Sequence, residues 1–259
     1  MTKRTSLIAV AAAALSITAA MPGAVQAKDL RIALGLPEVY AAFEPLSTFA
    51  ATLENEAGLA SKVYAMSLLT LAETAGGVRD GLTDIGFVVF PYAPVEFSEV
   101  NLIANLSMLA TTGQLVEIPG AAMAGASMEY TLLNCPDCMT QMKANNQVYL
   151  SGASTTAYGL LCTKPISSAE DVKGKRFRAG AANYARWAEV LGGSAVSVPG
   201  NEVYDAMSQG IVDCTMSNLG DLIGGRYIDV STHVTIGAPG GTFLGLGSAN
   251  VNRDAWLEL

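Results

Sequence analysis

A seven-residue junction occurs twice in the chain, and it constrains the possible fold more than any other feature of the sequence. One copy, at 79–85, reads Arg-Asp-Gly-Leu-Thr-Asp-Ile, and the other, at 208–214, reads Ser-Gln-Gly-Ile-Val-Asp-Cys. Each has the pattern of a helix end, a glycine in a left-handed cap, an apolar anchor and an aspartate that precedes a strand. Two such copies in similar surroundings predict two lobes of similar architecture.

The surroundings of each copy alternate between strand and helix patterns. In the first half we predict strands at 29–36, 61–66 and 84–90, and helices at 43–58, 71–80 and 100–110. In the second half we predict strands at 176–179, 195–198 and 213–217, and helices at 183–191 and 202–209. This alternation is typical of an α/β fold with parallel crossovers. Ligands of open α/β sheets bind outside the carboxyl ends of the strands, which places a cleft near Phe90–Tyr92 and Ser217–Asn218.

Small residues mark the two places where the chain is expected to pass between lobes. The first is Leu150-Ser-Gly152 and the second is the glycine-rich stretch 237–241. We assign lobe I to residues 28–150, lobe II to 151–238, and a return crossing into lobe I to 239–259. The two crossings would act as a hinge.

The first 27 residues have the pattern of a secretory signal. Lys3 and Arg4 precede an almost unbroken apolar run from Leu7 to Ala20, and Ala27 is the small residue that a signal peptidase needs. The run is shorter than the roughly 20 residues of a membrane span. We therefore predict cleavage after Ala27 and an exported protein. Cleavage removes two of the 15 basic residues and none of the 23 acidic ones, so the formal charge changes from -8 to -10.

Charge and histidine content exclude several classes of function. An acidic chain with no basic face is a poor partner for nucleic acid. The chain has one histidine, His233, which rules out a multi-histidine metal site, and a Ser/His/Asp or Cys/His catalytic site would have to use it. His233 stands in an ordinary polar stretch, and the chain has no Gly-x-Ser-x-Gly motif. We expect neither a metal ion nor a cofactor.

The four cysteines allow three interpretations. Cys135 and Cys138 form a Cys-Pro-Asp-Cys motif, which in an exported chain is a local disulfide, a redox pair or half of a zinc site. Zinc would need two more ligands, and Cys162 and Cys214 are distant in sequence. A redox pair should open a helix, whereas the apolar pattern of 128–145 indicates a helix already under way. We favour structural disulfides, with Cys162 and Cys214 as a second bridge between neighbouring strands.

An ordered series of motifs resembles the DctP-type solute-binding proteins of TRAP transporters. These motifs are Lys164-Pro-Ile166, Asp171–Arg178, Leu191-Gly-Gly193, Glu202–Asp213, Asn252–Leu259 and, in the first half, Arg79–Phe87. The resemblance implies a two-lobe, type II-like periplasmic binding protein with a hinge and an interlobe cleft. It also implies a receptor that captures a small carboxylate or related organic anion and delivers it to a TRAP membrane permease. Relatives continue for some tens of residues beyond the Trp256 match, so we expect this chain to lack their C-terminal segment.

The resemblance also implies which residues bind the ligand. Arg178 matches the arginine that forks the ligand carboxylate, and a planar guanidinium suits that task; the alternative is an exposed strand residue beside Lys175 and Arg176. Ser217, with Asn218 next, matches the polar position at the end of the following strand. Tyr158 stands where sialic-acid-binding relatives carry a second cation, which implies a smaller or less charged ligand.

Four further side chains are weaker candidates for the ligand site. Tyr40, Tyr92 and Phe243 could wall the pocket, although aromatic residues at strand ends more often belong to the core. Glu73 begins the 71–80 helix, where a carboxylate is favourable without any ligand. The competing functions are a secreted thiol-redox or hydrolytic enzyme, and a binding protein that serves a sensor or an ABC permease.

Overall fold

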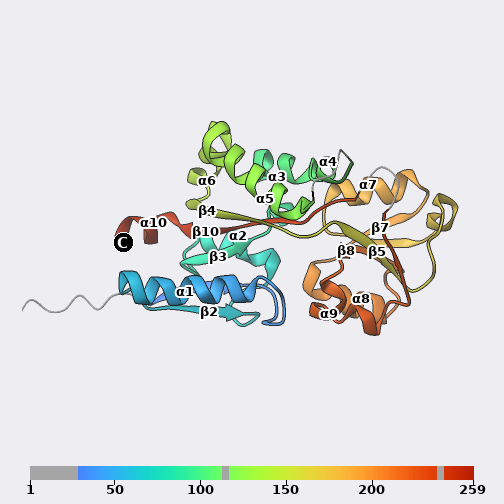
Figure 1. Ribbon diagram of the computed structural model, residues 1–259, viewed down its shortest axis with the longest axis horizontal. Helices are drawn as coiled ribbons and strands as arrows, with labels where there is room; N and C mark the ends of the chain where they lie inside the picture. The colour runs from blue at the N-terminus through green and yellow to red at the C-terminus, as the bar shows by residue number, and fades with distance from the viewer. Residues whose placement is uncertain (1–28, 113–116, 238–241) are drawn as a thin grey trace, which may run out of the picture.

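The computed structural model describes residues 29–112, 117–237 and 242–259. The predicted signal at 1–27 lies outside these residues, and so do positions 238–241 of the glycine-rich stretch 237–241. Two five-stranded sheets, each flanked by helices, lie side by side along the long axis of the molecule (Figure 1). None of the helices in the described part of the chain is long and apolar enough to cross a bilayer.

In the first sheet four strands run in one direction and a fifth, β10, runs against them. Its order is β2-β1-β3-β10-β4, and β10 runs antiparallel to both neighbours. The strands are β1 (Leu30–Leu34), β2 (Ser61–Ala65), β3 (Ile85–Val88), β4 (Gln147–Ser154) and β10 (Leu246–Asn252).

The second sheet repeats this plan. Its order is β7-β6-β8-β5-β9, with β6 parallel to β7 and β8, and with β5 antiparallel to β8 and β9. The strands are β5 (Tyr158–Cys162), β6 (Arg176–Ala179), β7 (Ser194–Ser197), β8 (Cys214–Asn218) and β9 (His233–Thr235). We call the first sheet and its helices lobe I, and the second sheet and its helices lobe II. The predicted α/β fold with two similar lobes is confirmed.

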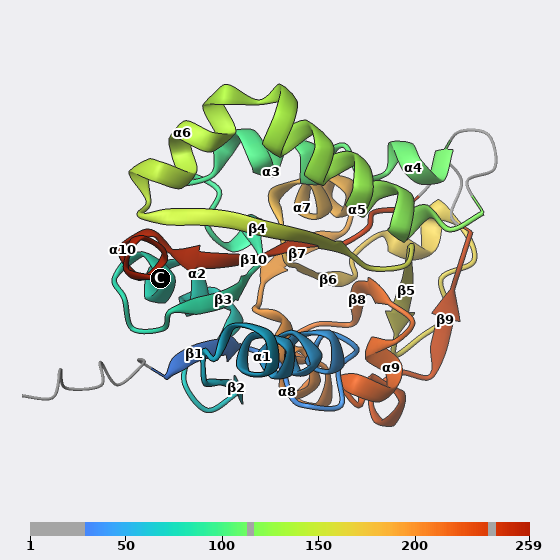
Figure 2. The ribbon, with the colours of Figure 1, turned by 60° about the vertical axis from the view of Figure 1, so that its left-hand side comes forward.

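Apolar faces on both sides of each sheet are covered by helices. In lobe I, α1 packs over β1 and β2, while α2, α3 and α6 enclose a second cluster with β3 and β4. In lobe II, α7 covers one face and α8 the other (Figure 2). The helices are α1 (Phe43–Ala57), α2 (Leu71–Arg79), α3 (Ser98–Asn105), α4 (Leu109–Thr112), α5 (Pro119–Glu129), α6 (Pro136–Ala144), α7 (Ala182–Val190), α8 (Val203–Ser208), α9 (Asp221–Gly224) and α10 (Arg253–Glu258).

The repeated junction folds in the same way in both lobes. Gly81 and Gly210 follow α2 and α8 with φ of 72° and 66°, the left-handed conformation that glycine adopts without strain. In lobe I the Asp84 carboxylate accepts hydrogen bonds from the backbone N–H (2.9 Å) and Nε (3.1 Å) of Arg31 at the start of β1. In lobe II the Asp213 carboxylate accepts the same two bonds from Arg176, at 2.9 and 3.0 Å. Each aspartate therefore fixes the start of a parallel strand.

Both cysteine pairs are disulfides, Cys135–Cys138 and Cys162–Cys214. Cys162 and Cys214 face each other in the β5–β8 register, which confirms the predicted bridge between neighbouring strands. The prediction that the first pair lies inside a continuing helix is wrong. A π-helical turn (Tyr130–Asn134) ends α5, and α6 begins anew at Pro136, with Cys135 as its N-cap. Proline favours the first position of a helix because it has no N–H to leave unsatisfied.

Candidate ligand-binding site between the two lobes

Arg178 lies at the carboxyl end of β6, where the chain turns toward α7. The residue is only 6% exposed, whereas the Arg176 side chain is 45% exposed and paired with Asp213. Arg178 Nε donates to the Val198 carbonyl oxygen at 2.7 Å, and Nη2 donates to Tyr92 Oη at 2.8 Å. Nη1 forms no hydrogen bond with any residue that the structure describes. Arg178 is therefore a buried cation whose Nη1 hydrogens are available to a ligand.

Tyr92 brings lobe I to this arginine. Its 3-10 turn, Phe90–Tyr92, follows β3, and the phenol oxygen accepts from both Arg178 Nη2 and the Gly200 backbone N–H, the latter at 3.0 Å. Tyr227 of lobe II donates to the Gly200 carbonyl at 2.9 Å. The predicted cleft residue Tyr92 is thus bonded directly to two positions of the opposite lobe.

Tyr40 makes a second contact between the lobes. It lies between β1 and α1, and its half-buried ring packs against the backbone of α9, where a Cβ on Gly224 would lie 3.3 Å from ring carbons. A Cβ on Gly225 would lie 2.7 Å from the Tyr40 phenol oxygen. Burial and the neighbouring Asp221 raise the pKa of Tyr40 to about 12, so the phenol stays protonated at neutral pH. Glycine at 224 and 225 therefore lets Tyr40 approach closely.

Ser217 and Asn218 are the last two residues of β8, the strand next to β6 and Arg178. Ser217 is buried, and its hydroxyl donates to the carboxylate of Asp221, the first residue of α9. Burial raises the pKa of Asp221, and hydrogen bonds from Ser217 and Asn218 oppose that rise. Sequence reasoning missed Asp221, although an aspartate soon after a strand end, at the predicted cleft, was a usable signal. The hydroxyl of Thr215, opposite Arg178 in the β6–β8 register, is buried and has no hydrogen-bond partner among the described residues.

Tyr158 and Phe243 form an aromatic wall beside Arg178, with Tyr184 between them. The Tyr184 ring centroid lies 5.8 Å from that of Tyr158 and 4.5 Å from that of Phe243. Burial raises the pKa of Tyr158 well above its ordinary value, and Arg178 acts electrostatically against that rise. The phenol that replaces a second cation is therefore a neutral group close to the arginine.

Glu73 stands apart from this cluster. Its side chain is exposed, and Oε2 accepts from the Thr70 backbone N–H at 2.9 Å and from the Thr70 hydroxyl at 2.8 Å. These bonds form a capping box at the start of α2. They lower the pKa of Glu73. Because the two bonds from Thr70 already engage the Glu73 carboxylate, we leave Glu73 out of the proposed site.

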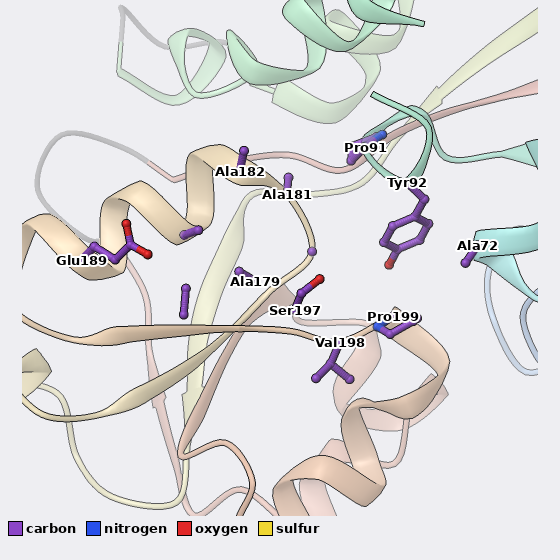
Figure 3. A pocket seen from close by; sticks show the side chains of 13 residues that line it. Ala72, Pro91, Tyr92, Ala179, Ala181, Ala182, Glu189, Ser197, Val198 and Pro199 are labelled. Atoms are coloured by element: carbon purple, nitrogen blue, oxygen red, sulfur yellow. The ribbon is translucent and has the colours of Figure 1, made fainter. Parts of the chain in front are cut away.

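A cavity of about 590 Å³ opens beside the arginine. Lobe I contributes Ala72, Pro91 and Tyr92, and lobe II contributes the segments 179–182 and 195–199 and part of α7 (Figure 3). A Cβ added to Gly180, which lines the cavity, would lie 2.8 Å from the guanidinium carbon of Arg178. The guanidinium therefore lies directly behind a residue without a side chain. Among the described residues no group of three or more His, Cys, Asp or Glu is arranged to hold a metal.

Two α/β lobes that share a cavity beside a buried arginine define a periplasmic binding protein of the two-lobe class. Residues 43–256 match the bacterial extracellular solute-binding proteins of family 7, the DctP family, and the chain belongs to this family. The family consists of solute receptors rather than enzymes, in agreement with the sequence prediction.

Solved structures of the family share the fold. A TRAP solute-binding protein from Rhodoferax ferrireducens with benzoate is similar at a TM-score of 0.77 and 17% identity, over 90% of this chain and 70% of that one. DctP6 of Bordetella pertussis, which binds pyroglutamic acid, has a TM-score of 0.74 and 20% identity, over 90% and 73% of the two chains. A Bordetella bronchiseptica protein with bound mandelate has a TM-score of 0.74 and 22% identity, over 90% and 71%.

One curated relative is similar over a shorter stretch. A solute-binding protein of Albidiferax ferrireducens is 34% identical over 77 residues, which are 30% of this chain and 23% of the relative. The match therefore spans about a quarter of that protein's length.

Proposed function

We propose that the protein is the extracytoplasmic receptor of a TRAP transporter, which captures a small carboxylate between its lobes and delivers it to a membrane permease. The observation that carries the proposal is the position of Arg178, buried at a strand end, next to the cavity and bonded to Tyr92 of the opposite lobe. Structures of relatives contain small carboxylates, namely benzoate, mandelate and pyroglutamic acid.

The bonding of Arg178 suits a carboxylate ligand. Val198 and Tyr92 occupy Nε and one hydrogen of Nη2, while the Nη1 edge of the guanidinium has no partner among the described residues. A carboxylate that docks on Nη1 and Nη2 would accept two parallel bonds, the strong geometry for this pair of groups. Ser217, Asn218, Tyr158, Tyr92, Phe243 and Tyr40 complete the proposed site.

We further propose that the lobes close around the ligand about two chain crossings. The division into lobe I at 28–150, lobe II at 151–238 and a return at 239–259 remains a proposal. The return of β10 into the first sheet supports it, while β4 stays in that sheet up to Ser154, so the first crossing would lie between Ser154 and Tyr158, the start of β5. Contacts from Tyr40 and Tyr92 would stabilise the closed form, and a ligand held by both lobes would shift the population toward it.

We assign the mature protein to the periplasm, with signal cleavage after Ala27. The family is extracellular by description, which agrees with this location. The partner would be the membrane permease of the same TRAP system. Mass spectrometry of the exported protein tests the cleavage site, since the mature chain should begin at Lys28.

A thermal-shift screen against small carboxylates tests the proposed receptor function. We expect at least one acid to raise the melting temperature of the mature protein, and Arg178→Ala to abolish that shift. Arg178→Lys retains the positive charge but loses the two parallel N–H donors of the guanidinium, and it should reduce the ligand-induced rise in melting temperature. Arg186→Ala, on the exposed side of α7, is the control and should leave it intact. A full ligand shift in a folded Arg178→Ala protein would disprove the assignment.

A further inference from the structure

Small apolar residues dominate the lining of the cavity between the lobes. Six of its 13 lining residues are alanines, at 72, 179, 181, 182, 185 and 195, and Pro91, Val198 and Pro199 add further apolar surface. The polar side chains of the lining are those of Tyr92, Ser197 and Glu189. A ligand rich in hydroxyl groups would exchange its bonds to water for contacts with methyl groups, which is unfavourable. An apolar body, in contrast, would gain from burial against this surface.

The charges around the cavity favour one carboxylate and disfavour two. The residues that line the cavity include no lysine and no arginine. Among the described residues, the single positive charge next to it is that of Arg178, which lies against the lining residue Gly180. Two acidic groups accompany it, Asp221 beside Ser217 and Glu189 on α7. Glu189 and Tyr92 lie at opposite ends of the labelled lining (Figure 3). A ligand with a second carboxylate at its far end would place it near Glu189, an exposed residue of like charge, and no cation of the lining compensates it there.

From this lining we infer, on the basis of the proposed receptor function, that the ligand is a monocarboxylate with an apolar aromatic or alkyl body, and not a dicarboxylate or a sugar acid. The carboxylate binds at Arg178 and the body lies along the alanines of α7 and β7. The lining side chains are short and leave a cavity of about 590 Å³, which is large enough for an aromatic ring. Glu189 is the residue that selects against a second negative charge.

Calorimetric titration of the mature protein with three acids tests this inference. Benzoate and terephthalate differ only by a second carboxylate, which in terephthalate lies at the opposite end of the ring, and glucuronate replaces the apolar ring by a hydroxylated one. We expect benzoate to bind at least about tenfold more tightly than either of the others, because an uncompensated charge or unpaired hydroxyls are costly to bury. Benzoate here stands for the ligand class and is the probe used.

Variants at two lining positions of α7 assign the selectivity to named residues. Glu189→Lys should reduce the preference for benzoate over terephthalate about threefold, since a cation at this exposed position then stands near the second carboxylate. Glu54→Lys, the same change at an exposed position of α1, should leave the preference unchanged. Ala182→Trp fills the cavity from an exposed position of α7 and should weaken benzoate binding about tenfold or more. Val190→Trp, also exposed on α7 but outside the lining, is its control.

The possible outcomes separate this inference from the proposed function. Terephthalate or glucuronate binding as tightly as benzoate, with loss of binding in Arg178→Ala, would overturn the inference and leave the receptor function standing. An unchanged preference in Glu189→Lys would overturn the role of Glu189. Absence of Arg178-dependent binding for every acid in the panel would overturn both proposals.

Discussion

Tyr92 Oη, in the 3-10 turn after β3 of lobe I, lies 2.8 Å from Nη2 of Arg178, in β6 of lobe II. The same phenol oxygen accepts from the Gly200 N–H, so one hydroxyl joins the end of β3 to two positions of lobe II. A phenol oxygen on the guanidinium occupies one of the donors that a ligand oxygen could use. The Arg178 guanidinium therefore takes part both in the contact between the lobes and in the proposed carboxylate site.

Removal of this hydroxyl should loosen the closed arrangement. Tyr92→Phe leaves a buried guanidinium hydrogen and the Gly200 N–H without their acceptor, at a cost of about 1–3 kcal/mol. We expect a lower melting temperature and, by small-angle X-ray scattering, a larger radius of gyration without ligand. Tyr130→Phe, an exposed tyrosine of the π-helical turn, is the control. Equal melting temperatures and radii for Tyr92→Phe and the wild type would argue against this contact.

The glycine pair at the end of α9 sets how closely Tyr40 approaches. A Cβ at Gly225 would lie 2.5 Å from a Tyr227 ring carbon and 2.7 Å from Tyr40 Oη, so Gly225→Ala should destabilise the protein by about 1–3 kcal/mol through overpacking. Gly125→Ala, in α5 with no atom within 4 Å of the added Cβ, should instead stabilise it by roughly 0.5–1 kcal/mol. Urea unfolding measures both, and a Gly225→Ala protein as stable as the wild type would contradict the described packing.

Asp221 should cost stability at neutral pH. Burial raises its pKa in the folded protein, so folding favours the protonated form. Its contribution to stability is most favourable below the unfolded pKa of about 3.9 and is lost as the pH rises through the higher folded value. Asp221→Asn should therefore raise the melting temperature at pH 7 by a few degrees, equivalent to about 1 kcal/mol, and the gain should shrink toward pH 4. A gain that is constant over this range would contradict the predicted linkage.

The two disulfides should contribute unequally to stability. Cys162–Cys214 closes a loop with a sequence separation of 52, and Cys135–Cys138 one with a separation of 3. In the chain-entropy account the first is worth about 4 kcal/mol and the second about 2 kcal/mol. Replacing each pair by alanine and measuring urea unfolding tests this order. A larger loss from removal of the Cys135–Cys138 bridge would reverse it.

Local patterns predicted the elements of the fold well, because they depend on residues close in sequence. The glycine and aspartate of each junction required only a helix end and a strand start, and both copies are present as expected. The Cys-Pro-Asp-Cys segment was misjudged because the apolar pattern of 128–145 continues through a π-helical turn that has no distinct sequence signal. Pro136 was the one local indication of a new helix.

The site itself was less predictable because it joins distant segments. Tyr92 and Arg178 are 86 residues apart, and Tyr92 and Gly200 are 108 apart. Family resemblance pointed to Arg178, but neither resemblance nor periodicity pointed to the Asp221 carboxyl or to the alanines of the cavity. The alanines come together in one cavity only through the way the two lobes pack against each other. This packing depends on contacts between segments that are far apart in the sequence.

A crystal structure of the mature protein with its best-binding carboxylate tests the central claim most directly. We predict that the ligand carboxylate lies between the lobes and accepts hydrogen bonds from Nη1 and Nη2 of Arg178, with the rest of the ligand against the alanines of α7 and β7. A carboxylate bound away from Arg178, or held by one lobe alone, would contradict the account.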